Sequence, residues 1–147
     1  MTARILFFGI LIFLGYFKLA SAQSGKLTIC NDTDDNINPI TVYTTATTST
    51  PVNFQIAVDS PLFGAAHSQA FIQWETFKVA ANGDETPVDQ KVMQTESGWL
   101  RYATTEPYYF PEPGKYAVYA IDYYKRDFLE HRGYTQYIAK TFIEITK

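Results

Sequence analysis

The amino-acid sequence predicts an all-β protein built as a two-sheet antiparallel sandwich. Residue types that favour strands are abundant, because the 147-residue chain contains 11 tyrosines and 11 phenylalanines alongside frequent threonine, valine and isoleucine. Its apolar runs are short and are interrupted by proline, glycine, asparagine and aspartate, which is typical of strands joined by turns. No stretch of the expected mature chain has the periodicity of a convincing helix. Roughly seven or eight short strands of this kind favour two packed sheets.

A polar loop separates the first expected strands. Residues 26–30 form the first strand, and residues 31–39 form a polar loop that ends with a proline. Residues 40–44 form either a short strand or the entry to the threonine-rich segment 44–50. Such a segment is typical of an edge strand and also of chain that carries O-linked sugar, so its composition leaves both interpretations open.

Two longer strands carry the clearest alternation. In residues 51–58 every second residue is apolar, and these residues share one face: Val52, Phe54, Ile56 and Val58. In residues 70–79, Ile72 and Trp74 lie on one face. The opposite face of that strand carries Phe71, Phe77 and Val79.

The C-terminal half continues as strands linked by turns. Residues 81–87 form a turn, and their Asn-Gly pair is the strongest hairpin signal in the chain. The remaining expected strands are residues 88–95, 99–104, 116–122 and 137–146. The charged residues 125–133 form either a long hairpin tip or one helical turn.

The N-terminal segment predicts export. Arg4 precedes an apolar run at residues 5–17, and the small residues 20–22 form the pattern that signal peptidase cuts after. The run is shorter than the about 20 residues that a membrane-spanning helix needs. We therefore expect residues 1–22 to be a cleaved signal peptide. Residues 23–147 are then secreted, placed at the cell surface or retained in a periplasm, without stable membrane insertion.

The mature chain is expected to be one domain with a mildly acidic charge. Residues 23–50 supply its N-terminal strand and threonine-rich polar loop, and residues 51–147 supply the sandwich core. The leader holds Arg4 and Lys18 and no acidic residue, so its removal changes the formal charge from −3 to −5. An acidic chain without clustered lysine and arginine is not suited to a phosphate backbone, so we expect no nucleic-acid partner.

Three segments resemble an immunoglobulin-like sandwich of the PKD-like or related bacterial surface-module type. Residues 51–54 (PVNF) resemble its second strand, Trp74 resembles the core tryptophan of its third strand, and residues 109–118 (YFPEPGKYAV) resemble the entry to its penultimate strand. The resemblance covers roughly residues 50–146 and specifies fold rather than activity. It implies that Tyr116 is a tyrosine-corner residue, whose hydroxyl bonds to the backbone a few residues upstream.

Cys30 is the only cysteine, so it cannot form a disulfide within the chain. One interpretation is a small buried apolar side chain near the first strand. The other is an intermolecular disulfide, which an odd number of cysteines in an exported chain suggests. The resemblance implies that the intersheet disulfide of antibody domains is replaced here by apolar packing against Trp74, near Phe54 or Ile56 and near Val118.

No catalytic motif is present, and the two histidines, His67 and His131, have no recognisable nucleophile and acid beside them. We expect a non-enzymatic binding module that recognises a protein or a glycan through loops or an aromatic sheet face. One alternative is a structural or assembly subunit, such as a homo-oligomer, that associates through an edge strand or through Cys30. A small secreted hydrolase is the third hypothesis.

Aromatic residues supply the candidate binding patch. Adjacent tyrosines in a strand point to opposite faces, so one of each pair is expected outside the core. An exposed aromatic ring combines apolar area with a polar group and suits sugar or protein contact. The candidate residues are Trp99, Tyr102, Tyr108 and Tyr124. The alternative is that these rings fill the core and cover sheet edges.

The polar loop after the first strand offers two further candidate sites. Asp32, Asp34 and Asn36 present oxygen atoms at alternate positions, which is a weak calcium pattern and the only cofactor indication in the chain. The alternative is a solvated turn in which these side chains bond local amides. Asn31 begins an Asn-Asp-Thr sequon, which predicts N-glycosylation if the source has a eukaryotic secretory pathway.

Overall fold

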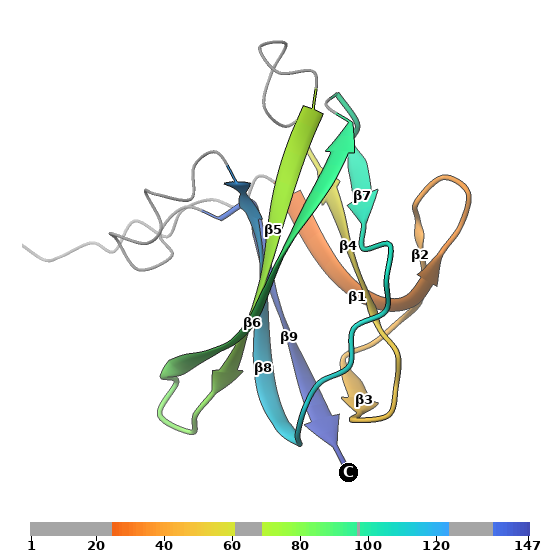
Figure 1. Ribbon diagram of the computed structural model, residues 1–147. Coiled ribbons are helices and arrows are strands. Elements are labelled where there is room, and N and C mark those ends of the chain that lie inside the picture. Colours follow the sequence, from red (N-terminus) through yellow and green to blue (C-terminus); the bar gives the residue numbers. More distant parts are fainter. Residues whose placement is uncertain (1–24, 61–68, 97, 124–136) are drawn as a thin grey trace, which may run out of the picture.

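A computed structural model of the chain describes residues 25–60, 69–96, 98–123 and 137–147 (Figure 1). These residues form nine β-strands and no α-helix, so the predicted all-β class is confirmed. No helix among the described residues has the length and apolar character needed to cross a membrane. The expected leader at residues 1–22 and the charged stretch at residues 125–133 lie outside the described residues.

The first sheet has four strands in the order β2-β1-β4-β7, and all its neighbours are antiparallel. Its members are β2 (Pro39–Val42), β1 (Gly25–Thr33), β4 (Asn53–Val58) and β7 (Arg101–Ala103). The first strand is longer than expected and takes in residues 31–33, because the polar residues there pair with β2 through Thr33 and Pro39.

The second sheet has five strands in the order β3-β9-β8-β5-β6. Its members are β3 (Thr45–Thr47), β9 (Ala139–Thr146), β8 (Gly114–Asp122), β5 (Gln69–Val79) and β6 (Glu85–Glu96). The prediction of wholly antiparallel sheets is wrong at one edge, where β3 runs parallel to β9. The three residues of β3 are too few for sequence alternation to reveal a partner.

The main apolar core is built from residues of both sheets, an arrangement compatible with a sandwich (Figure 1). The predicted face of residues 51–58 is confirmed, since the exposed fractions of Val52, Phe54, Ile56 and Val58 are 0%, 2%, 0% and 7%. Ile72 and Trp74 join this core, whereas Phe77 belongs to a second cluster on the other side of β5. The two predicted faces of β5 are therefore confirmed.

Two local features match the sequence. The Asn-Gly turn joins β5 to β6, where Gly83 has φ 90° and its N–H donates to the Ala80 carbonyl at 2.9 Å. Only glycine adopts this φ without strain, which explains the hairpin signal. Tyr116 is fully buried, and its hydroxyl donates to the Glu112 carbonyl at 2.9 Å, as expected of a tyrosine corner.

Candidate functional site

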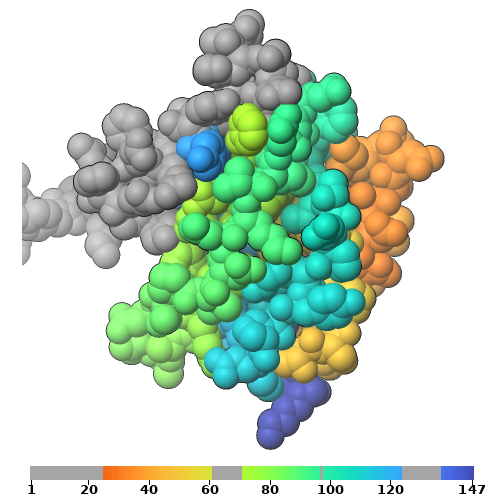
Figure 2. Space-filling model, viewed as in Figure 1, coloured from red at the N-terminus to blue at the C-terminus, as the bar shows by residue number. Residues whose placement is uncertain are grey.

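A groove opens where the edge of one sheet faces the edge of the other. Its first wall is β6, and its second wall is the segment that follows β7, residues 104–108; Figure 2 shows these two surfaces, green and teal, adjoining on one face. An inner hollow of about 250 Å³ and an outer hollow of about 610 Å³ share the residues Met93, Thr104 and Thr105. We call the two together the inter-sheet groove.

The groove exists because the two sheets differ in width at this side. Lys91 pairs with Trp74 and Met93 pairs with Ile72 across β5 and β6. Since paired residues share a face and Trp74 and Ile72 face the core, Lys91 and Met93 point inward too. The opposing strand β7 has only three residues. The inward face of β6 is therefore left partly uncovered.

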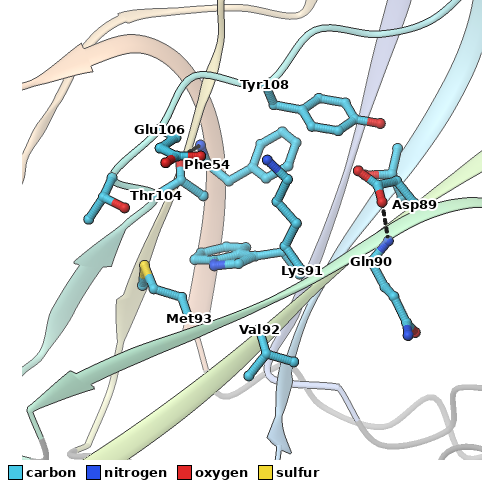
Figure 3. A pocket seen from close by; sticks show the side chains of 12 residues that line it. Phe54, Asp89, Gln90, Lys91, Val92, Met93, Thr104, Glu106 and Tyr108 are labelled. Atoms are coloured by element: carbon cyan, nitrogen blue, oxygen red, sulfur yellow. Dashed lines mark hydrogen bonds between the residues drawn. The ribbon is translucent and has the colours of Figure 1, made fainter.

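The second wall is held in place by the backbone of β4. Thr104 N–H donates to the Phe54 carbonyl at 2.9 Å, and Phe54 N–H donates to the Thr104 hydroxyl at 3.1 Å. Tyr108 and Val52 exchange two backbone hydrogen bonds of 2.7 and 3.0 Å. Figure 3 shows Thr104, Glu106 and Tyr108 on this wall and Lys91 and Met93 on the other. The wall is thus fixed at both ends without being a regular strand.

Buried aromatic rings form the floor of the inner hollow. The Phe54 ring lies 5.9 Å from Trp74 and 5.2 Å from Tyr108, measured between centroids. Trp74 is only 2% exposed. Its indole N–H has no hydrogen-bond acceptor among the described residues. A buried donor without an acceptor is uncommon and costly, so the polar group of Trp74 calls for an explanation beyond packing.

Trp99 and Tyr102 line the outer hollow. Their rings are stacked, with centroids 6.4 Å apart and planes at 24°. The Tyr102 hydroxyl donates to the Trp99 carbonyl at 2.7 Å, so Tyr102 fixes the backbone that carries Trp99. Trp99 is 44% exposed and Tyr102 is 1% exposed. Trp99 therefore offers an accessible ring at this end of the groove.

The predicted exposed patch of Trp99, Tyr102, Tyr108 and Tyr124 is only partly assembled. Tyr102 and Tyr108 are buried, so the expectation that they are exposed is wrong; Tyr102 points inward from β7, and the bridge to Val52 turns Tyr108 inward. The exposed neighbour is Tyr109, at 53%. Trp99, Tyr102 and Tyr108 nevertheless all line the groove. Tyr124 lies outside the described residues.

The groove has an acidic character. Among the described residues that line it are Asp89, Glu96, Glu106 and a single cation, Lys91. In the described part of the chain none of these four groups forms an ion pair. Burial raises the pKa of both Tyr102 and Tyr108, so these tyrosines add no negative charge near neutral pH. The described residues of the lining carry a surplus of two negative charges.

Glu85, at the start of β6, interacts with side chains on the outer face of its sheet. Lys140 lies 2.6 Å from a carboxylate oxygen of Glu85, and the Tyr119 hydroxyl donates to the same carboxylate. Lys140 also lies over the Tyr119 ring, at 4.6 Å from its centroid. On this face Gln73 donates to Glu75, and one side-chain oxygen of each is buried without a partner. No sequence pattern predicts this cluster, because it depends on the register of four strands.

The polar loop after β1 forms a turn. One Asp34 oxygen accepts the backbone N–H of Asn36 at 2.9 Å and that of Asn38 at 2.8 Å. These hydrogen bonds, above all those from Asn38, hold the pKa of Asp34 below its ordinary value. Asp32 accepts the N–H of Thr33. These hydrogen bonds are those of the solvated turn, and calcium at Asp32, Asp34 and Asn36 stays a prediction.

The other candidate residues occupy scattered positions. Asn31 is exposed on β1, where its sequon is accessible. Cys30 is 0% exposed, and burial raises the pKa of its thiol, as the buried interpretation predicts. His67 and His131 lie outside the described residues. Comparison of the chain with protein-family models, curated proteins and solved structures found no match.

Proposed function

We propose that the mature chain is a secreted or cell-surface binding module without enzymatic activity, and that its partner binds in the inter-sheet groove. The groove itself is the observation that carries this proposal. It combines an accessible aromatic ring at Trp99, an unpaired charged lining, and a buried Trp74 donor that lacks an acceptor. Pockets with an apolar floor and a few convergent polar groups are typical of binding sites.

The immunoglobulin-like type is the part of the proposal that concerns the fold. It is supported by the strand order of the two sheets, by the tyrosine-corner bond of Tyr116, and by the packing of Trp74 against Phe54. Scaffolds of this type are widespread among cell-surface domains, and they bind their partners through loops or sheet edges. Export is supported by the pattern of residues 1–22, and N-terminal sequencing of the natural product should begin at Gln23.

A groove-filling substitution tests the proposed site. Thr105 is exposed and lines both hollows, so Thr105→Trp places a bulky ring across the groove. Thr45→Trp is the matched control, because Thr45 is also exposed but lies on β3 at the opposite edge of its sheet. Capture of partners from native extracellular material should be lost with Thr105→Trp and kept with Thr45→Trp. Equal capture by the two variants would contradict a site in the groove.

One observation favours a second candidate function, that of a structural or assembly subunit. β6 is an edge strand of 12 residues, and such strands pair with other chains. The Cys30 route to assembly is not part of the proposal, because the thiol is buried.

A further inference from the structure

The outer edge of β6 is open. In the described residues β6 pairs with β5 on one side and with no strand on the other. Residues 89–96 pair one to one with residues 69–76, without a bulge. The Gln90 N–H donates to the Asp89 carboxylate at 2.8 Å instead of to β5 (Figure 3). Because N–H directions alternate along a strand, the N–H groups of Val92, Gln94 and Glu96 point to the same open edge.

The first part of β6 carries a proline and a register shift. Pro87 has no N–H, and the register shift near it leaves Val88 without a partner. Proline and bulges are devices by which proteins block unwanted strand addition. The second part, residues 89–96, carries neither, and Val92 within it is 48% exposed. A stretch of edge without proline or bulge, whose residues line the groove, points to a strand that pairs there.

The nature of the groove favours a polypeptide over a glycan. Sugars stack on exposed aromatic faces. Among the described aromatic residues that line the groove, Trp99 offers such a face, whereas Trp74, Tyr102 and Tyr108 are 2%, 1% and 8% exposed and do not. A peptide strand can instead supply backbone groups to β6 and a side-chain carbonyl to the Trp74 N–H. Met93, which lies between the hollows, is unbranched and adaptable enough to move aside. The surplus of acidic groups favours a strand with lysine or arginine side chains.

We infer that the partner is a basic, extended segment of another protein, which adds as a strand to residues 89–96 of β6 and places side chains in the inter-sheet groove. This inference rests on the proposed function and names the occupant of the same site. Main-chain hydrogen bonds provide the affinity in such strand addition, and pockets for alternate side chains provide the specificity. Asp89 and Glu106 are positioned to receive the basic side chains.

A pair of substitutions at one position tests strand addition. The probe is a library of linear random peptides, selected against the mature wild-type domain. Gln94→Pro removes an outward N–H that makes no bond to β5, whereas Gln94→Ala removes the same side chain and keeps the N–H. The selected peptides should alternate apolar and polar residues and carry lysine or arginine. Their affinity should fall by about tenfold or more, equivalent to about 1.4 kcal/mol, with Gln94→Pro and stay near wild type with Gln94→Ala.

Hydrogen exchange of the wild-type domain keeps the test decisive if Gln94→Pro does not fold. Saturation with a selected peptide should protect the amides of Val92 and Gln94 far more than those of Lys91 and Met93, which already face β5. Peptides that bind Gln94→Pro and Gln94→Ala equally, or that leave these amides unprotected, would overturn strand addition.

The other outcomes separate this inference from the proposed function. If the library yields no binder while a glycan array does, and Thr105→Trp abolishes glycan binding, the groove is a site but its occupant is not a strand. If the domain forms a dimer that Gln94→Pro disrupts, the strand comes from a second copy and the assignment to a basic partner is wrong. If Asp89→Lys combined with Glu106→Lys leaves the affinity for basic peptides unchanged, the proposed charge recognition fails.

Discussion

Replacement of Trp74 by phenylalanine separates the two roles that this residue has in the structure. The ring packs in the main core, 5.9 Å from Phe54, whereas the indole N–H is buried without an acceptor among the described residues. Phenylalanine keeps an aromatic ring in the core and removes the donor. The free domain should therefore tolerate Trp74→Phe, although the residue is 2% exposed.

Two opposing terms set the expected magnitude. Removal of a buried donor that lacks an acceptor stabilises the free domain by about 1–3 kcal/mol. The smaller ring loses roughly two buried carbons, which costs about 1.5 kcal/mol at about 0.8 kcal/mol for each CH2 group. The free energy of unfolding should thus change by between about −0.5 and about +1.5 kcal/mol, whereas Phe54→Ala beside it should lower it by about 3–5 kcal/mol.

Urea unfolding of the mature wild type, Trp74→Phe and Phe54→Ala measures these differences. If Trp74→Phe lowers the free energy of unfolding nearly as much as Phe54→Ala does, the reasoning is refuted, because the N–H then already contributes to the stability of the free domain. Affinity for a selected peptide should fall with Trp74→Phe, since the donor that the peptide satisfies is then missing. This split between stability and affinity is the signature of a binding role.

Three further predictions concern the rest of the fold. Tyr116→Phe removes a donor that is satisfied by Glu112, so it should cost about 1 kcal/mol in urea unfolding, and an unchanged midpoint would speak against the tyrosine corner. The Cys30 thiol is buried and its pKa is raised by that burial, so a thiol reagent should modify it only as the domain unfolds; rapid modification of the native domain would contradict this. Asp34 has a pKa held below its ordinary 3.8 by Asn38, so its charged form favours the folded state above that pH, and the benefit is lost as pH falls through the lowered folded pKa. Asp34→Ala should therefore be less stable than wild type near neutral pH and approach it in acid, and a carboxyl titration above 3.8 would contradict this sign.

The strands that sequence reasoning located best are those in which side-chain alternation dominates. The alternation in residues 51–58 identified one face of β4 correctly, and the Asn-Gly pair located the β5–β6 turn. Both depend on residues that are neighbours in the chain. The short β3 and its parallel pairing with β9 depend on a contact between the two ends of the domain, which no local pattern encodes.

The groove was not predictable for the same physical reason. Its existence depends on how far β7 extends opposite β6. The lengths of these strands, three residues in β7 and 12 in β6, cannot be deduced from propensity. Trp99 was identified as an accessible aromatic residue, but Tyr102 and Tyr108 were assigned to the wrong side of the fold. The unsatisfied donor of Trp74 is visible only when all neighbouring acceptors have been placed.

The indole N–H signals of the two tryptophans test most directly whether a peptide strand occupies the groove. Trp74 lines the inner hollow, Trp99 lines the outer one, and the chain contains no other tryptophan. In an NMR titration with a selected basic peptide, both signals should move, and the Trp74 signal, identified by its loss in Trp74→Phe, should also become protected from exchange. If saturating peptide leaves the Trp74 signal unmoved and unprotected, the partner binds elsewhere and the groove is not the site.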